Sequence, residues 1–237
     1  MKPPTPTSVR RQAFTLIEAI VVVGLIVILA GVLLPALPNC KAKAPRIKCA
    51  NNLKQVALAF KVFAHDHDGR FPFETPELTD RGLDRRAWTQ FLVLSNELGS
   101  AKILWCPGDT SGRSAATEFG WGVAAPSDSL VRMQNNAVSF FIGIGARSNT
   151  PNAILTGDCN VAPSASAPLY SSRGAAPFVP MSTNLVWSTR MAHHDLAGNV
   201  ALGDGSVQQI TTSGLQTQVR QAAAESGPNA NRFVFPQ

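Results

Sequence analysis

The chain has 237 residues, with 21 Lys and Arg against 15 Asp and Glu and a formal net charge of +6. Its basic residues are scattered, and no basic stripe interleaved with aromatic residues occurs, so we expect no nucleic-acid partner. The 17 prolines and 18 glycines indicate a loop-rich domain and argue against an all-helical bundle.

An uncharged apolar run occupies residues 19–37, and it is about long enough for one membrane crossing. Three interpretations compete. A cleaved secretory signal has a shorter apolar core, although Ala42-Lys43-Ala44 offers a cleavage sequence. A lipoprotein signal ending at Cys40 is disfavoured because bulky, polar Asn39 precedes the cysteine. We favour a permanent anchor. Basic residues flank the run on both sides, so charge does not set its orientation.

The string that leads into this run is Ala13-Phe14-Thr15-Leu16-Ile17-Glu18, preceded by Arg10 and Arg11. It resembles the type IV prepilin signature. The resemblance implies cleavage by a prepilin peptidase between Ala13 and Phe14, and methylation of the new Phe14 amine. It also makes Glu18 the fifth mature residue, tied to assembly, and Pro35 a helix-kinking proline. The departure from the signature is Ala13, where glycine is usual.

Glu18 is a carboxylate at the edge of an oily segment, where an ionised group is costly unless it is paired. Cleavage would create a cationic amine on Phe14, and a neighbouring subunit could present that amine to Glu18. The alternative is a carboxylate at a helix N-terminus, where the helix dipole favours it.

Residues 46–65 repeat apolar side chains at helical spacing and predict an amphipathic helix that carries the globular domain. Prolines 38 and 45 predict a break near its start. The apolar positions are Ile47, Leu53, Val56, Leu58, Phe60 and Phe63.

The helix should end at His65-Asp66-His67-Asp68-Gly69. Asp66 and Asp68 imitate the start of a calcium loop, but Arg70 and Phe71 stand where further features of that loop belong. A turn and helix cap is the better interpretation. We therefore expect no metal and no other cofactor.

Residues 86–94 predict a short helix, and residues 101–105, 137–145 and 153–157 predict strands. Residues 160–180 are rich in Pro, Ser, Ala and Gly and predict a long surface loop.

Near the C-terminus, Gly198-Asn199 and Asp204-Gly205 are turn dipeptides that indicate antiparallel strands. His194 followed nine residues later by Asp204 and Gly205 resembles the H-x9-DG element of many prepilin-like proteins. A histidine near a carboxylate would suit base catalysis or metal binding. No nucleophile motif, H-E-x-x-H or phosphate loop occurs. We therefore expect His194 to fix a hairpin turn, and no enzyme activity.

Four cysteines, Cys40, Cys49, Cys106 and Cys159, lie far apart without a C-x-x-C, which excludes zinc-ribbon and thioredoxin motifs. One or two disulfides, or simply buried thiols, remain open. Cys40 is the cysteine most expected to stay free.

The resemblance implies an α+β, pilin-like fold in which a long N-terminal membrane-spanning helix packs on a small antiparallel β-sheet head. The expected parts are a leader (1–13), a transmembrane helix (14–38), an amphipathic stem (39–65), a head (66–212) and a C-terminal tail (213–237). The expected location is the inner membrane, single-pass, with an extracytoplasmic head.

The function this implies is a structural subunit of a type IV pilus-like or type II secretion pseudopilus filament. Its expected partners are the membrane, a prepilin peptidase and other pilin-like subunits. Two alternatives remain. One is a monomeric anchored binding module that uses the 160–180 loop, and the other is an anchored hydrolase centred on His194 and Asp204.

Overall fold

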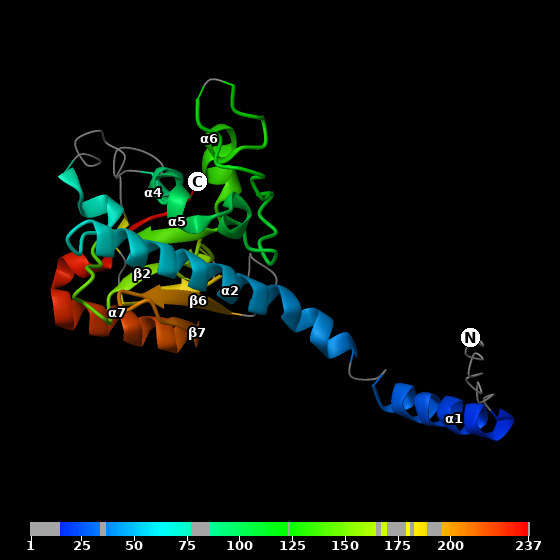
Figure 1. Ribbon diagram of the computed structural model, residues 1–237. Helices are drawn as coiled ribbons and strands as arrows, with labels where there is room; N and C mark the ends of the chain where they lie inside the picture. Colours follow the sequence, from blue (N-terminus) through cyan, green and yellow to red (C-terminus); the bar gives the residue numbers. More distant parts are fainter. Residues whose placement is uncertain are drawn as a thin grey trace, which may run out of the picture. The chain divides into compact units, whose positions relative to one another are not determined.

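The computed structural model describes residues 15–33, 37–76, 86–122, 124–164, 167–169, 179–180, 183–188 and 196–236. The chain divides into two compact units, residues 1–43 and 44–237, whose elements are labelled in Figure 1. The boundary falls inside one helix. Most of the predicted stem therefore belongs to the same unit as the head, and the predicted boundary after residue 65 does not separate two bodies.

The first unit contains helix α1, Leu16–Leu33. Among the described residues, no helix is both long enough and apolar enough to cross a membrane. The 18 residues of α1 extend about 27 Å at 1.5 Å per residue, short of a hydrocarbon core of roughly 30 Å. The predicted membrane-spanning helix over 14–38 is therefore wrong, as is the part of the fold class that depended on it. The predicted single-pass inner-membrane location is likewise overturned.

Helix α2, Leu37–Asp66, continues through Pro45, so the predicted break does not occur within it. Most of the predicted apolar positions do form its buried side: Leu53, Val56, Phe60 and Phe63. Ile47 and Leu58 were assigned to this side wrongly, since both are about 60% exposed (59% and 62%). Leu58 lies two residues from Val56 and from Phe60, and a helix turns about 100° per residue, so Leu58 points away from both.

The head contains a six-stranded antiparallel sheet with the strand order β4-β8-β1-β2-β6-β7. Its strands are β1 Phe140–Gly143, β2 Ile154–Asp158, β4 Val179–Pro180, β6 Ala197–Leu202, β7 Val207–Thr211 and β8 Arg232–Val234. A separate pair joins β3, Val161–Ala162, to β5, Val186–Trp187. The α+β class with an antiparallel sheet is thus present, and predicted strands 137–145 and 153–157 correspond to β1 and β2.

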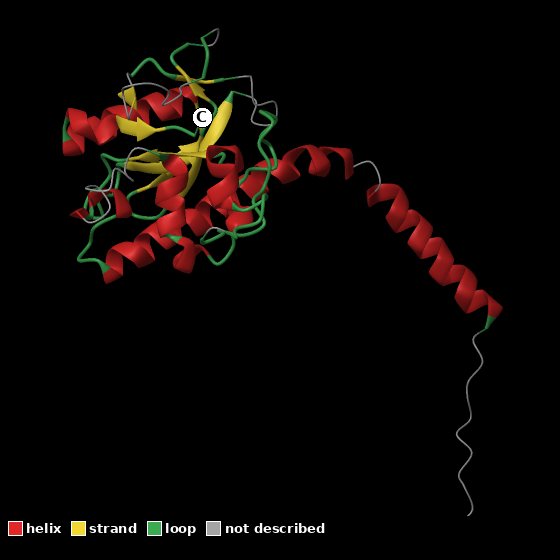
Figure 2. Cartoon of the chain, turned by 90° about the horizontal axis from the view of Figure 1, so that it is seen from above, coloured by secondary structure: helices red, strands yellow, loops and turns green. Residues whose placement is uncertain are grey.

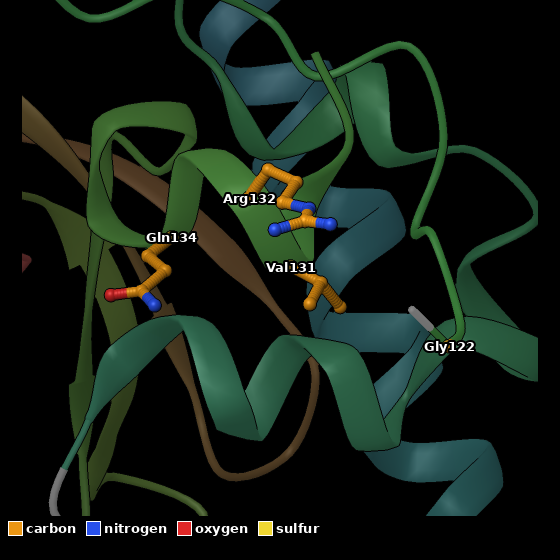
Figure 3. Close-up of a pocket in the computed structure, with 4 residues that line it drawn as sticks. All are labelled: Gly122, Val131, Arg132 and Gln134. Carbon is orange, nitrogen blue, oxygen red and sulfur yellow. The ribbon is translucent and has the colours of Figure 1, made fainter. Parts of the chain in front are cut away.

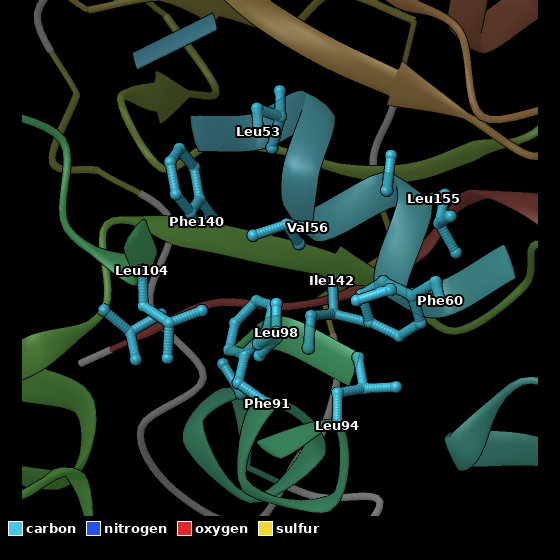
Figure 4. Close-up of a cluster of buried hydrophobic side chains, with 14 of the residues drawn as sticks. Leu53, Val56, Phe60, Phe91, Leu94, Leu98, Leu104, Phe140, Ile142 and Leu155 are labelled. Atoms are coloured by element: carbon cyan, nitrogen blue, oxygen red, sulfur yellow. The ribbon is translucent and has the colours of Figure 1, made fainter. Parts of the chain in front are cut away.

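Both faces of the sheet are covered, as Figure 2 shows from above. Successive side chains of a strand point to opposite faces. Phe140 and Ile142 of β1 therefore join the cluster formed with α2, whereas Phe141 joins a second cluster on the other face. Figure 4 shows the α2 cluster, in which Phe60 lies among side chains from β1 and the short helices.

Short helices complete the layer on the α2 side. They are η2 Pro72–Glu74, α4 Ala87–Val93, α5 Ser95–Leu98, η4 Ala101–Leu104, α6 Leu130–Met133 and η5 Gln134–Ala137. The predicted helix over 86–94 is confirmed as α4. The predicted strand over 101–105 is wrong, because the segment is the 3-10 helix η4. Ser100 caps its first turn, and the buried residues Ala101 and Leu104 are three apart, the period of a 3-10 helix.

The predicted tail over 213–237 is part of the fold. It forms α7 Thr212–Ser226, η6 Pro228–Asn231 and β8, which pairs with both β1 and β4. Leu215 and Val219 of α7 and Phe233 of β8 are buried in the second cluster, where the Phe233 ring meets Phe141 edge-on at 5.2 Å. Removing this segment would uncover that face of the sheet.

Two other predicted features differ. Gly198 and Asn199, predicted as a turn, lie inside β6 and pair with Ile210 and Gln209 of β7. Of the predicted loop over 160–180, residues 161–162 and 179–180 are strand, and residues 165–166 and 170–178 lie outside the described part of the chain.

A disulfide joins α2 to the head. Cys49 is bonded to Cys106, with a Cα–Cα distance of 4.9 Å and a sequence separation of 57. Next to it, the Asn52 amide donates to the carbonyl of Trp105 at 3.0 Å. Cys159 is a buried free thiol, and the side chain of Cys40 lies outside the described residues. This settles the pairing that the sequence left open for Cys49 and Cys106.

Replacing Cys49 and Cys106 together by serine should lower the free energy of unfolding of the full chain by about 2–4 kcal/mol, because the unfolded chain is released from a long closed loop. Urea unfolding of wild type and variant measures this. Reductant should bring wild type to the variant's midpoint and leave the variant unchanged. A wild-type midpoint that does not respond to reductant would contradict the assignment.

Candidate functional site

Glu18 takes part in a capping box at the start of α1. The Glu18 carboxylate accepts from the Thr15 backbone N–H at 3.4 Å, and the Thr15 hydroxyl oxygen accepts from the Glu18 N–H at 3.4 Å. Such reciprocal bonds satisfy backbone donors that a helix start leaves without intrahelical partners. Glu18 therefore has a local role, close to the alternative that the sequence left open. Ala13, Phe14 and Pro35 lie outside the described residues.

Asp204 and Gly205 form the turn between β6 and β7. The Asp204 carboxylate accepts from the Ser206 N–H at 2.8 Å, and the Gly205 N–H donates to the Leu202 carbonyl at 2.9 Å. Gly205 has a φ of 88°, a conformation that L side chains rarely adopt. The predicted turn at Asp204-Gly205 is confirmed, and its two residue types are the ones that such a turn demands.

This turn contacts α2. The Lys61 ammonium donates to the Gly203 carbonyl at 3.1 Å, and a Cβ on Gly205 would lie 3.3 Å from the Lys61 side chain. The Gly203 N–H in turn donates to the Ala153 carbonyl at 2.8 Å. The Asp-Gly element thus holds one end of the β6–β7 hairpin against the stem helix. We call this contact, formed by Lys61 and residues 203–205, the stem–turn junction.

His194, the other half of the H-x9-DG element, lies outside the described residues. The Asp204 carboxylate is exposed and is used within its own turn. A hollow of about 370 Å³ beside the junction is lined by Lys61, Ala64, His65, Gly69 and Ser148. None of these lining residues carries a carboxylate. The Asp204 carboxylate therefore stabilises its own turn, and nothing in this geometry assigns it the role of a general base.

The His65–Asp68 string ends α2 as the sequence predicted. The ring of His67 stacks on Phe63 at a centroid distance of 3.8 Å, and its Nδ1 lies 2.8 Å from the Phe63 carbonyl oxygen. Asp68 has a φ of 54° where the chain turns. Within the described ranges, no group of three or more His, Cys, Asp and Glu side chains is arranged to hold a metal.

A buried polar pair that the sequence did not reveal lies at the end of β2. Asp158 accepts from both the backbone N–H and the side-chain amide of Asn199, at 2.8 and 2.9 Å. Burial raises the pKa of Asp158 to about 7, partly opposed by these hydrogen bonds from Asn199. The sequence could have indicated this pair, because Asp158 is a carboxylate at the end of the apolar strand 154–158. The pair was not predicted because Asn199 was assigned to a turn.

A second buried carboxylate, Asp109, holds the loop that follows the disulfide. It accepts from the hydroxyl of Ser139 at 2.7 Å and from the backbone N–H of Ser111 at 2.9 Å. The Arg113 guanidinium reaches Asp109 at 3.3 Å and donates to the Pro236 carbonyl at 3.1 Å. These bonds tie the loop to the start of β1 and to the C-terminal segment.

The chemistry of this cluster is structural. Burial raises the pKa of the Cys159 thiol to about 12, so the thiol stays protonated and is a poor nucleophile. The Ser139 hydroxyl donates to a carboxylate, and the histidines that the structure describes, His65 and His67, lie on and just after α2. The cluster therefore fixes the loops around the disulfide.

Asp158 makes stability depend on pH. Because its pKa is raised from the ordinary 3.8 to about 7, the folded state holds a proton that the unfolded state loses. The stabilising contribution is complete below pH 3.8 and falls as the pH rises to about 7. Asp158→Asn keeps an acceptor for Asn199 without a titrating group. The free energy of unfolding of the variant, relative to that of wild type, should therefore rise by on the order of 2 kcal/mol between pH 5 and pH 8.

Urea unfolding of both proteins at each pH measures that difference. Taking the difference between the two proteins isolates the contribution of position 158. A difference between the proteins that stays constant from pH 5 to pH 8 would show that Asp158 is ionised throughout.

Comparison with known proteins adds no relative: no family model matches the chain, and neither the curated proteins nor the solved structures yield a match.

Proposed function

We propose that this chain is a structural subunit of a type IV pilus-like or type II secretion pseudopilus filament, cleaved and N-methylated by a prepilin peptidase before assembly. The observation that carries the proposal is α1, an apolar helix exposed on all sides that begins within a string resembling the prepilin signature. The role is structural and not enzymatic.

The surface of α1 is the main physical support. Its large apolar side chains are exposed along the whole helix, from Leu16 (80%) through Leu25 (56%) to Val32 (71%). A helix that is hydrophobic all round needs other apolar surface around it. Copies of the same helix offer that surface in matching length, so α1 helices packed side by side would form the filament core.

Glu18 is the second support. In the single chain its carboxylate caps α1 together with Thr15. In a filament core, the amine of a neighbour's processed Phe14 would also need a counter-charge, because an unpaired ammonium among apolar helices is costly. Glu18 can accept from that amine on one oxygen and keep its capping bond on the other. Its one carboxylate would thereby set the axial register between neighbours.

A filament also requires that each head follow its own stem. α2 is held to the head at two separated points, by the Cys49–Cys106 disulfide and by the bond from Lys61 to the Gly203 carbonyl. Between these two points, Leu53, Val56 and Phe60 are fully buried. Force applied to the stem would therefore reach the sheet without loosening a hinge inside the second unit.

Processing gives the first test. The mass and N-terminal sequence of the protein isolated from its native cells should show a chain that starts at methylated Phe14. A chain that retains Met1, or that starts at Cys40 or beyond Ala44, would overturn the proposal.

Glu18→Gln gives the second test, because it separates the cap from the charge. Glutamine preserves a capping box, so α1 should remain helical, but it cannot neutralise a neighbour's amine. We expect filament yield, measured by sedimentation and electron microscopy, to fall by about tenfold or more, as for a lost buried charge pair. Thr15→Ala is the matched control, since it removes capping bonds and keeps the charge.

The two variants give opposite patterns under the two explanations. Loss of filaments with Glu18→Gln and their retention with Thr15→Ala supports the charge pair. Normal filaments from Glu18→Gln would reduce Glu18 to a helix cap and contradict the pairing.

A further inference from the structure

The side of α2 that faces away from the sheet carries exposed apolar side chains. Ile47, Leu58 and Val62 are 59%, 62% and 43% exposed. At about 100° per residue, these three positions lie within about 60° of one another around the helix axis. Outside α1, the described part of the chain exposes only two further large apolar side chains, Trp121 and Leu196. Such a concentration on one side of one helix is typical of a contact surface.

This side of α2 is also basic. Lys54 is exposed and lies four residues before Leu58, so the two side chains are neighbours on the helix surface. α2 contains six Lys and Arg residues and no Asp or Glu before Asp66. Within the described residues, the Lys54 ammonium makes no ion pair. We call the surface formed by Ile47, Lys54, Leu58 and Val62 the stem stripe. Its charge and its apolar side chains fit a partner that presents an apolar group beside negative charge.

A loop of the head presents both of these properties. Trp121 is 67% exposed, and the exposed carboxylates Glu118 and Asp128 lie in the same loop. Backbone hydrogen bonds join the two arms of the loop: the Thr117 N–H donates to the Asp128 carbonyl at 3.0 Å, and the Leu130 N–H donates to the Glu118 carbonyl at 2.8 Å. Among the described residues, neither carboxylate makes an ion pair. We call the surface formed by Glu118, Trp121 and Asp128 the acidic loop.

The acidic loop is fixed by packing before any partner binds. Gly120, with a φ of 69°, lies so close to Ser129 that a Cβ would approach the Ser129 Cβ to 2.4 Å. The residue that precedes Trp121 therefore has little freedom to move. A surface that is already ordered costs less conformational entropy when it binds.

A hollow of about 500 Å³ adjoins the acidic loop. It is lined by Gly122, Val131, Arg132 and Gln134, which Figure 3 shows around one open space. Because Gly122 directly follows Trp121, the hollow leaves room for a partner beside this end of the loop. Arg132 already has an interaction partner within the chain. The two loop carboxylates are therefore the charges that this surface offers to another molecule.

We propose that the stem stripe of one copy of the chain binds the acidic loop of a second copy. The Lys54 ammonium can pair with Glu118 or Asp128. It can also lie over the Trp121 ring, against which Leu58 packs. This contact joins two different surfaces, so it is heterologous, and its repetition can extend an open filament. The inference rests on the filament proposal and names one contact within the filament.

Other surfaces of the chain fit the stem stripe less well. A second stem stripe is excluded, because two basic surfaces repel each other. Helix α1 offers apolar surface, but its one carboxylate, Glu18, caps its own helix. The acidic loop is better matched, because it combines an exposed ring with two carboxylates that make no ion pair among the described residues.

Carbodiimide cross-linking of filaments isolated from the native cells tests the contact directly. This reagent joins an amine to a carboxylate without a spacer, so the two groups must already touch. Cross-linked species of dimer mass and larger should yield peptides that join Lys54 to Glu118 or Asp128. Filaments in which Lys54 is joined to neither carboxylate would overturn this contact without affecting the filament proposal. Absence of filaments would overturn both.

Charge reversal gives a second test. Lys54→Glu should lower filament yield by about fivefold or more, because it places like charges opposite each other. Lys48→Glu is the matched control. It makes the same change at an exposed position of α2 about 120° around the helix from Lys54, and it should assemble as wild type does.

Combining Lys54→Glu with Glu118→Lys and Asp128→Lys should restore at least about half of the wild-type yield, because the charges are again opposite. Thermal unfolding of each variant checks the fold, which should be intact because all of the changed side chains are exposed. The contact is overturned if Lys54→Glu assembles normally, if Lys48→Glu is equally impaired, or if the folded triple variant assembles no better than Lys54→Glu.

Discussion

The fold depends on the burial of one side of α2 against the central sheet. Leu53, Val56 and Phe60 of α2 are fully buried in the cluster that also contains Phe140 and Ile142 of β1. Without α2, one face of a six-stranded sheet would meet water across its hydrophobic side chains. The stem helix is therefore part of the folding unit of the head, because the core of the head is incomplete without it.

The same dependence explains why the polar contacts of α2 occur where they do. Packing fixes how far α2 approaches the sheet, and the disulfide and the Lys61–Gly203 bond then lie at two separated points along its length. The tight glycine-containing turn at residues 203–205 lets Lys61 reach a backbone carbonyl. A larger side chain at position 205 would contact the Lys61 stem and would strain the turn. The Asp-Gly pair is thus explained by packing against a helix as well as by turn geometry.

Periodicity in the sequence predicted elements whose burial is decided locally. The spacing of Leu53, Val56, Phe60 and Phe63 predicted the buried side of α2, and Asp204-Gly205 predicted a turn, because each pattern matches the geometry of one element. Features decided by distant segments were not predicted. Asn199 is an ordinary turn residue by composition, but it lies inside β6, where it pairs with Gln209 of β7 and donates to Asp158, forty-one positions earlier.

The C-terminal strand β8 was not predicted, for a related reason. Phe233 alternates with Val234 across a very short strand, which gives too few residues for a recognisable period. The cysteine pairing also depended on distance in space, since many residues separate Cys49 from Cys106. The exposure of Trp121 was also not predicted, because the sequence does not show which aromatic residues fill the core and which are left on the surface.

The exposed apolar surface of α1 differs in kind from that of the head. The apolar surface of α1 is continuous along the helix, so it favours contact with another surface of the same kind. Trp121, in contrast, is a single exposed ring in the head. The loop that carries Trp121 is closed on itself by backbone hydrogen bonds to residues 128–131.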